Sequence, residues 1–336
     1  MIVKRIFRFL LVCLLLLGLA VGWGVADLRR FARTPMAEDG PERSVIVPAG
    51  QGFAGVLSSL ESAGIVSDPI RFRLLARWRG FDRRVQAGEY RLSAAMTPLR
   101  VLRDLTEGRV VLHRLTIPEG FDLERIARAV GETGLATERE FRAVATDPDF
   151  AREQGIPADD LEGYLFPDTY RFPRTATARG IALAMLGRFR AVFGEGWRAR
   201  AEEMGWSVHE IVTLASIVER ETGVPEERPL VASVFHNRLR IGMRLQSDPT
   251  AVYGLADFEG PITRKHLDTP TPYNTYRIPG LPPGPIASPG RAALEAALFP
   301  AETDYLYFVS RDDRTHVFST NLRDHNRAVR AYRRRR

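Results

Sequence analysis

Two glutamates near the end of one apolar segment are the residues best suited to chemistry. Residues 209–221 (HEIVTLASIVERE) have apolar positions at helical spacing and carry Glu219 and Glu221 beside them. A carboxyl group that borders an apolar helix face is partly removed from water. Its pKa is therefore raised, and a proton stays available near neutral pH. On a helical wheel the two glutamates lie on opposite sides of the apolar stripe, so the spacing does not choose between them.

Polar residues that could line a cleft lie downstream of these glutamates. Residues 229–240 (PLVASVFHNRLR) have helical spacing, and residues 246–250 (QSDPT) form a predicted polar loop. Residues 271–286 (TPYNTYRIPGLPPGPI) are rich in proline and glycine, which hold a chain on a rigid path. The pattern is compatible with an acid–base site, but glutamates near a helix end are more often solvated surface residues, here beside a rigid surface loop.

Missing signatures argue against several other chemistries. The 336 residues contain no P-loop, no HExxH zinc motif and no GxSxG nucleophile elbow. The single cysteine, Cys13, allows neither an intramolecular disulfide nor a cysteine-based metal site, and we expect no metal and no cofactor.

The formal net charge of +7 favours an anionic partner. The basic residues do not interleave with aromatics, so we expect no nucleic-acid binding.

An uncharged segment near the N-terminus predicts a membrane anchor. Residues 9–26 (FLLVCLLLLGLAVGWGVA) lack charges, and at about 1.5 Å per residue they nearly span a hydrocarbon core of about 30 Å. Residues 1–8 carry three basic side chains and are expected in the cytoplasm, which places the rest of the chain outside the cytoplasmic membrane. A cleaved signal peptide is the alternative, because small residues near position 24 keep cleavage open.

The remaining pattern predicts an α+β protein. Residues 27–43 are charged, contain two prolines and show no apolar period, which predicts a linker. Residues 44–118 predict the order β-α-α-β-α-β, with strands at 44–48, 87–92 and 110–117 and helices at 53–60, from 67 and at 97–108. A helical connector, 119–160, with helices from 122 and at 136–150, precedes a mixed α/β segment, 161–330. That segment has predicted helices at 178–193, 209–221 and 229–240, a strand at 305–309, and a basic tail after it at 331–336.

Several sequence blocks together carry a family resemblance. The blocks are LEGYLFPDTYRF (161–172), ASIVERET (215–222), SVFHNRLRIGMRLQSDPTAVYG (233–254) and TPYNTYRIPGLPPGPI (271–286) followed by SPG. In this order they resemble the endolytic murein transglycosylase family over roughly residues 44–330. The resemblance implies an inner-membrane protein with a LysM-like subdomain at 44–118 and a catalytic domain at 161–330. The implied partners are peptidoglycan glycan strands and cell-wall synthases of the elongation and division machinery.

The resemblance also implies a reaction and its residues. It implies cleavage of the β-1,4 bond between N-acetylmuramic acid and N-acetylglucosamine in nascent strands, leaving a 1,6-anhydromuramyl end. The implied acid/base is the first glutamate of ASIVE, Glu219. One carboxyl group suffices because an intramolecular hydroxyl replaces water as nucleophile. The implied substrate-binding residues are Asn237, Gln246, Asp248, Tyr273 and Asn274. The aromatic-rich 164–170 segment suits sugar stacking or a packed core.

Two other functions remain as alternatives. A non-catalytic peptidoglycan-binding or division scaffold would share the same blocks, and only product analysis separates it from an enzyme. A pyridoxal-phosphate lyase needs a Schiff-base lysine, for which only Lys265 is available outside the anchor flank.

Overall fold

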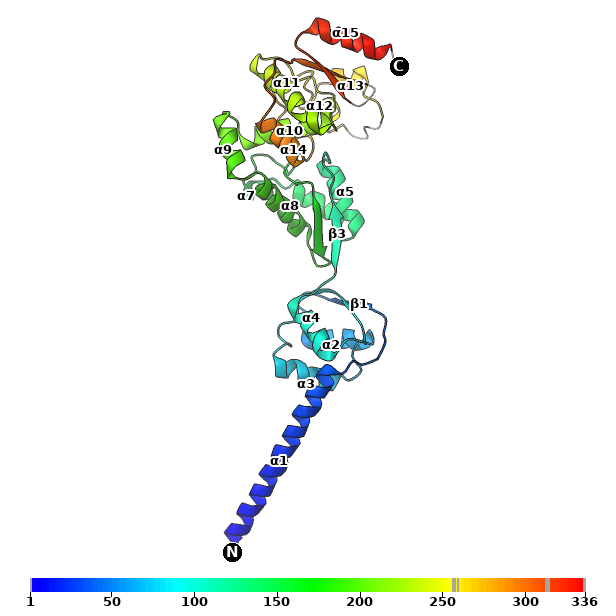
Figure 1. The fold of residues 1–336 in the computed structure, drawn as a ribbon, viewed down its shortest axis with the longest axis vertical. Helices are drawn as coiled ribbons and strands as arrows, with labels where there is room; N and C mark the ends of the chain where they lie inside the picture. The colour runs from blue at the N-terminus through cyan, green and yellow to red at the C-terminus, as the bar shows by residue number, and fades with distance from the viewer. Residues whose placement is uncertain (1, 256–257, 259, 312–314, 335–336) are drawn as a thin grey trace. The chain divides into compact units, whose positions relative to one another are not determined.

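The chain folds into two compact units in a computed structural model that describes residues 2–255, 258, 260–311 and 315–334 (Figure 1). Unit 1 comprises the residues up to 113 together with Arg171–Thr175, and unit 2 comprises Arg114–Tyr170 and the residues from 176 onward. The chain passes between the units along two paired strands, β3 (Leu112–Thr116) and β4 (Thr169–Pro173). Helices and strands mix in this structure, as the predicted α+β class requires.

Unit 1 follows the predicted element order. After helix α1 (Ile2–Arg33) come β1 (Arg43–Val47), α2 (Phe53–Ser62), α3 (Pro69–Arg79), β2 (Gly88–Leu92) and α4 (Pro98–Glu107). Strands β1 and β2 are antiparallel, with Val45 opposite Tyr90, and their buried residues join those of α2, α3 and α4 in one core. The third predicted strand of this region is β3, which pairs with β4 and does not extend the β1–β2 sheet.

Local capping sequences explain where the helices of unit 1 begin and end. Asp68 precedes Pro69 and accepts a hydrogen bond from the Arg71 N–H, as expected for an N-cap followed by proline. Thr97 does the same for α4, which ends at Gly108 in the left-handed conformation (φ 68°). These boundaries confirm the predicted ones.

Helix α1 is longer than the predicted anchor. It continues to Arg33, so the first part of the expected 27–43 linker is helical. Leu28, Phe31 and Ala32 pack against the core of unit 1, and this packing extends the helix beyond its apolar run. The segment Lys4–Arg33 of this helix is long enough and apolar enough for a membrane anchor or a signal sequence.

Unit 2 carries the remaining elements. They are α5 (Leu123–Thr133), α6 (Glu138–Ala145), α7 (Pro148–Glu153), α8 (Ala178–Val192), α9 (Glu195–Glu203), α10 (Val208–Glu221), the 3-10 turn η1 (Pro225–Glu227), α11 (Arg228–Arg240), α12 (Asp248–Val252), α13 (Arg264–Asp268), α14 (Arg291–Leu298), β5 (Tyr307–Ser310), β6 (His316–Ser319) and α15 (Leu322–Arg333).

Two predicted boundaries in unit 2 differ from the structure. The single helix expected at 136–150 is two helices, because Asp147 caps α7 and Pro148 cannot continue the hydrogen bonds of α6. The predicted tail at 331–336 overlaps the end of α15, and its last two residues lie outside the described residues.

Helix α10 lies at the centre of unit 2 and positions both glutamates. A capping box between Ser207 and Glu210 starts it, and every residue from Ile211 to Val218 is buried. It packs against α11 and α14, while α15 covers the antiparallel β5–β6 hairpin and α11 contacts β5. Glu219 and Glu221 therefore stand on the last turn of a tightly held helix.

Candidate active site

Glu219 has protein partners for both of its carboxylate oxygens. Its Oε1 lies 3.2 Å from Arg228 Nη2, and its Oε2 accepts a 3.0 Å hydrogen bond from the Gly290 N–H. Its side chain is only 6% exposed, and that of Arg228 is 10% exposed. Because Arg228 begins α11 and Gly290 caps α14, Glu219 links three helices.

Glu119 completes this group, which we call the Glu219 cluster (Glu119, Glu219, Arg228, Gly290). Glu119 Oε2 lies 3.7 Å from the same Arg228 nitrogen, and its carboxyl group covers Gly290 so closely that a Cβ there would be 1.9 Å from Oε1. Burial raises the pKa of Glu219, while Gly290 and Arg228 oppose the rise. The cluster therefore holds two carboxyl groups around one buried guanidinium.

Glu221 faces a different environment. It lines a cavity of about 550 Å³, the Glu221 cavity, and no ion pair to it occurs among the described residues. The Ser247 hydroxyl donates a short hydrogen bond to Glu221 Oε1. Burial raises the pKa of Glu221 to about 7, with Asp248 adding to the rise and Ser247 and Arg238 opposing it. Glu221 thus holds an exchangeable proton near neutral pH beside open space.

Segments far apart in the sequence form the walls of the Glu221 cavity. The polar residues come from the ends of α10 and α11, the loop that leads into α12, the 271–286 segment and the C-terminal β5, β6 and α15. Besides Glu221 they include Arg238, Gln246, Asp248, Tyr276, Tyr307, His316 and His325. An acid, hydrogen-bonding groups and an aromatic ring on one cavity suit the binding and cleavage of a sugar polymer.

Hydrogen bonds hold these walls in place. The Tyr276 hydroxyl donates to Asp248 Oδ1 at 2.6 Å, and Arg238 donates to the carbonyl oxygens of Leu306 and Leu245 at 2.7 and 2.5 Å. Arg238 therefore joins α11 to the strand region that carries Tyr307. Gln246 has φ of 48°, a left-handed backbone that is uncommon for a side-chain-bearing residue.

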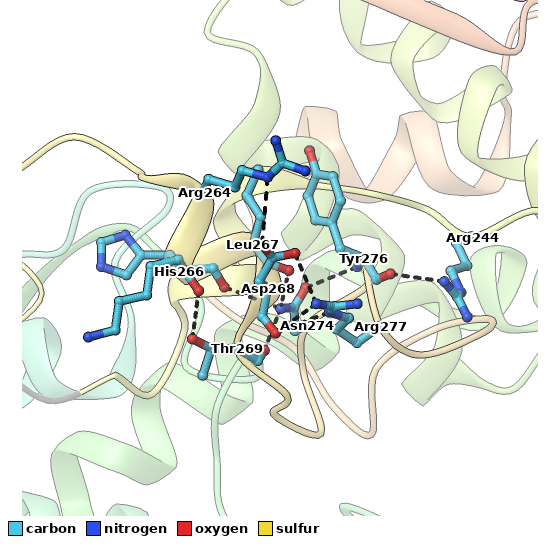
Figure 2. Close-up of polar contacts among 10 residues, drawn as sticks. Arg244, Arg264, His266, Leu267, Asp268, Thr269, Asn274, Tyr276 and Arg277 are labelled. Carbon is cyan, nitrogen blue, oxygen red and sulfur yellow. Dashed lines mark hydrogen bonds and ion pairs between the residues drawn. The ribbon is translucent and has the colours of Figure 1, made fainter.

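Asn274, one of the predicted substrate-binding residues, is fully buried. Its amide donates to three carbonyl oxygens at the end of α13, those of His266, Leu267 and Thr269 (3.3, 3.1 and 2.7 Å), as Figure 2 shows. Its Oδ1 accepts a 3.0 Å hydrogen bond from the Tyr276 N–H. We interpret Asn274 as the residue that positions Tyr276, since none of its side chain reaches solvent.

Asn237 and Tyr273 also lie away from the Glu221 cavity. The Asn237 amide donates to the carbonyl oxygens of Thr303 and Tyr305 at 2.7 and 3.0 Å, which ties α11 to the segment before β5. Tyr273 packs on Tyr253 with ring centroids 4.7 Å apart and lines a separate cavity of about 520 Å³. Of the five predicted substrate-binding residues, the structure brings Gln246 and Asp248 to the Glu221 cavity.

The aromatic 164–170 segment belongs mainly to the core. Tyr164 and Phe166 are buried, and the Tyr164 hydroxyl is 2.9 Å from His209 Nδ1. Glu162, just before it, is also buried and accepts hydrogen bonds from the Leu123 N–H and the Tyr253 hydroxyl. Burial raises the pKa of Glu162 to about 8. The packed-core interpretation of these aromatics fits the structure.

Sequence reasoning missed several residues of the Glu221 cavity. Tyr276 and Arg238 lie inside the quoted blocks, so their types and places were available as a signal. Tyr307 and His325 lie beyond those blocks, and no local pattern predicts that β5 and α15 line the same cavity as the end of α10.

Neither a metal nor a pyridoxal site is evident at this cavity. No group of three or more His, Cys, Asp or Glu side chains placed to hold a metal occurs in the part of the chain that the structure describes. Lys265 is exposed on α13 and does not line the Glu221 cavity.

Comparisons with known proteins agree on one family. The model of the YceG-like family matches residues 45–331. An endolytic murein transglycosylase of Bacillus subtilis strain 168 is 32% identical over 305 residues, which cover 86% of this chain and 84% of that protein. One from Streptococcus pneumoniae D39 is 31% identical over 318 residues, covering 85% of this chain and 57% of that longer protein. A crystal structure of a YceG-like protein from Listeria monocytogenes superposes with a TM-score of 0.59 at 32% identity, covering 86% of this chain and all of that one.

Proposed function

The chain belongs to the YceG-like family, and from that membership we propose that it cleaves nascent peptidoglycan strands. From the geometry of the Glu221 cavity we propose Glu221 as its acid/base. It is a lytic transglycosylase, as its curated relatives are named. The proposed bond is the β-1,4 link between N-acetylmuramic acid and N-acetylglucosamine, and the proposed product carries a 1,6-anhydromuramyl end.

One observation carries the choice of residue. Glu221 faces the Glu221 cavity, together with Gln246 and Asp248, whereas both oxygens of Glu219 are held by Arg228 and Gly290. A general acid must reach the oxygen that it protonates, and Glu219 would first have to break a buried ion pair. The proposal therefore moves the acid/base role from Glu219, which the family resemblance implied, to the second glutamate of the same turn.

The proposed mechanism needs a single carboxyl group. Protonated Glu221 donates its proton to the glycosidic oxygen as the bond from that oxygen to C1 breaks. The resulting carboxylate then accepts the proton of the muramyl 6-hydroxyl as that oxygen bonds to C1. Water is not consumed, and Glu221 ends protonated again, ready for another cycle. The hydrogen bond from Ser247 stabilises the carboxylate between these two steps.

Asp248 is placed to assist the same transition state. Its carboxylate lines the Glu221 cavity and is oriented by the Tyr276 hydroxyl at 2.6 Å. Positive charge develops at C1 when the glycosidic bond breaks, and a fixed negative group nearby lowers the energy of that state. Gln246 supplies an exposed amide for sugar hydroxyls in the same cavity.

A pair of nearly isosteric variants tests the assignment. Full-length Glu221→Gln and Glu219→Gln are incubated with lipid-linked nascent glycan, and the products are analysed by mass spectrometry. We expect no anhydro-muramyl product from Glu221→Gln and detectable product from Glu219→Gln. An active Glu221→Gln beside a folded but inactive Glu219→Gln would return the role to Glu219. Absence of product from the wild-type protein under conditions where a relative is active would favour the scaffold alternative.

The proposed location follows from α1. We propose that residues 9–26 cross the cytoplasmic membrane, with residues 1–8 in the cytoplasm and the rest outside it, where nascent strands are made. The apolar length of α1 supports this placement. Within the outer part we propose that residues 44–118 form a LysM-like subdomain that binds glycan. We propose that residues 119–160 form a helical connector and that residues 161–330 form the catalytic domain. Cell-wall synthases are the proposed partners.

A further inference from the structure

Helix α3 of unit 1 exposes three large apolar side chains on one face. Ile70, Leu74 and Trp78 are 73%, 53% and 45% exposed, and their spacing of four residues aligns them along the helix. We call them the α3 stripe. The opposite face of the same helix carries Phe72 and Leu75, which are fully buried in the unit 1 core. A soluble surface rarely presents such a row of apolar residues without a partner.

Arginines border the α3 stripe on both sides. Arg71 lies on one side, and Arg73 and Arg77 lie on the other, all exposed at the helix surface. The Arg79 guanidinium lies 5.0 Å from the centre of the Trp78 ring. Apolar side chains flanked by arginine, with a tryptophan among them, are typical of helices that lie in the interface of a bilayer with anionic lipids.

The α3 stripe lies where α1 would leave the membrane. Arg71 Nε is 3.3 Å from Asp27 Oδ2, and the Arg29 guanidinium is 5.9 Å from the Trp78 ring. Asp27 directly follows the apolar run of 9–26. Leu28 and Phe31 pack into the unit 1 core, so α1 and α3 form one body, as Figure 1 shows for this unit. A bilayer around α1 would therefore end close to α3.

We propose that the α3 stripe rests in the outer surface of the membrane that α1 crosses, with anionic phospholipid headgroups bound by its flanking arginines. The proposal rests on the membrane crossing of α1 proposed above. Continuity with α1 and the surplus of arginine favour a lipid surface over a second copy of this chain, which would bring like charges together. Such contact would fix the orientation of unit 1 on the bilayer.

Spin labels on single cysteines in the full-length protein test the proposal. The label is placed on native Cys13, on Leu74→Cys or on Ser58→Cys, the last two combined with Cys13→Ser. Ser58 is an exposed residue of α2 and serves as the control. Each protein is placed in nanodiscs at one copy per disc, made of phosphatidylcholine alone or with phosphatidylglycerol. Collision with oxygen, which concentrates in lipid, is compared with collision with a water-soluble nickel chelate.

We expect the ratio of oxygen collisions to nickel-chelate collisions to be several-fold higher for the label at position 74 than for the label at position 58. The difference should grow when the disc contains phosphatidylglycerol. Arg77→Glu should remove that dependence on anionic lipid. A label at 74 as water-exposed as that at 58, with Cys13 in lipid, would overturn the α3 proposal alone. A water-exposed label at Cys13 would overturn the membrane crossing itself. Protection of position 74 from both reagents, with dipolar broadening between labels at two copies per disc, would identify a second copy as the partner.

Discussion

At the scale of single residues, two carboxyl groups two positions apart differ in what holds their oxygens. The carboxylate of Glu219 is bound by Arg228 and the Gly290 N–H. The carboxylate of Glu221 accepts a hydrogen bond from Ser247 and faces the Glu221 cavity. A carboxylate whose two oxygens are held by buried partners must release them before it can protonate a substrate, whereas one that faces a cavity can reach it directly. The proposed chemical role therefore rests on the neighbours and not on the residue type.

The pH dependence of activity should report Glu221. Since its pKa is about 7 and the protonated form starts the reaction, the rate should fall as pH rises through about 7. The Ser247 hydrogen bond lowers that pKa, so Ser247→Ala should move the alkaline limb to higher pH. The measurement is the initial rate against pH, with Ser59→Ala of unit 1 as a control that leaves the limb in place. A shift to lower pH would contradict the assignment.

Stability should distinguish the same two residues. The folded state raises the pKa of Glu221, so ionised Glu221 destabilises the protein above pH 7, and Glu221→Gln should raise the melting temperature at pH 8 but not at pH 4. The pKa of Glu219 is raised as well, so its charge also weakens the fold at pH 8. Glu219→Gln nevertheless leaves the buried Arg228 guanidinium without this partner, and we expect a net lower melting temperature. Thermal unfolding of the two full-length variants at both pH values checks this. Equal effects of the two substitutions would count against the different roles.

At the scale of elements, short irregular segments hold the site more than the regular ones do. The 271–286 segment uses buried Asn274 to bind the end of α13 and to orient Tyr276 (Figure 2). The Tyr276 hydroxyl in turn donates to Asp248 Oδ1. The block at 161–172 fits beneath α10 through Gly163, which has φ of 79° and lies against Pro285 and Val212. Such turns depend on one residue each, so single substitutions there have large effects.

Gly163→Ala should therefore destabilise unit 2 strongly. A Cβ at this position would lie 2.5 Å from Pro285 side-chain atoms, on a backbone that side-chain-bearing residues rarely adopt. We expect a loss of about 2–4 kcal/mol from overpacking and backbone strain together. Gly187→Ala in α8, where nothing lies within 4 Å, is the matched control and should be neutral or slightly stabilising. Chemical denaturation of both variants provides the measurement, and equal midpoints would reject the argument.

At the scale of the whole molecule, the N-terminal helix combines two features. Its first part has the length and apolarity of a membrane anchor, and its last turns complete the core of unit 1 through Leu28, Phe31 and Ala32. A membrane anchor raises the local concentration of an enzyme beside a membrane-bound substrate. Helix α1 is continuous from this apolar part to the residues that pack in unit 1.

Truncation should separate these two features. An exported variant that begins at Asp27 keeps the three packing residues, so unit 1 should stay folded and cleavage in vitro should persist, while complementation in cells falls. A variant that begins at Pro35 loses those residues, and its unit 1 should lose amide protection in hydrogen exchange. Equal protection in both variants would show that the end of α1 is dispensable for the core. Equal complementation by the Asp27 variant would argue against the anchoring role.

Much of this molecule is determined by local sequence. Helix starts such as Asp68-Pro69 and Thr97-Pro98 were predictable because capping involves residues within one turn. The apolar stripe of α10 and the apolar run at 9–26 were predictable because their periodicity and length follow from helix geometry. The polar blocks around Gln246 and Asp248 likewise marked one wall of the cavity in advance.

Only the tertiary structure decided which glutamate faces that cavity. On α10 alone Glu219 and Glu221 are equivalent, because each borders the same apolar stripe. They become different when Arg228 and Gly290 bind the oxygens of Glu219, while β5, β6 and α15, about 90 to 110 residues later in the chain, line the cavity that Glu221 faces. Local periodicity carries no information about such distant partners, and burial and charge from those partners set the pKa and the access of each carboxyl group.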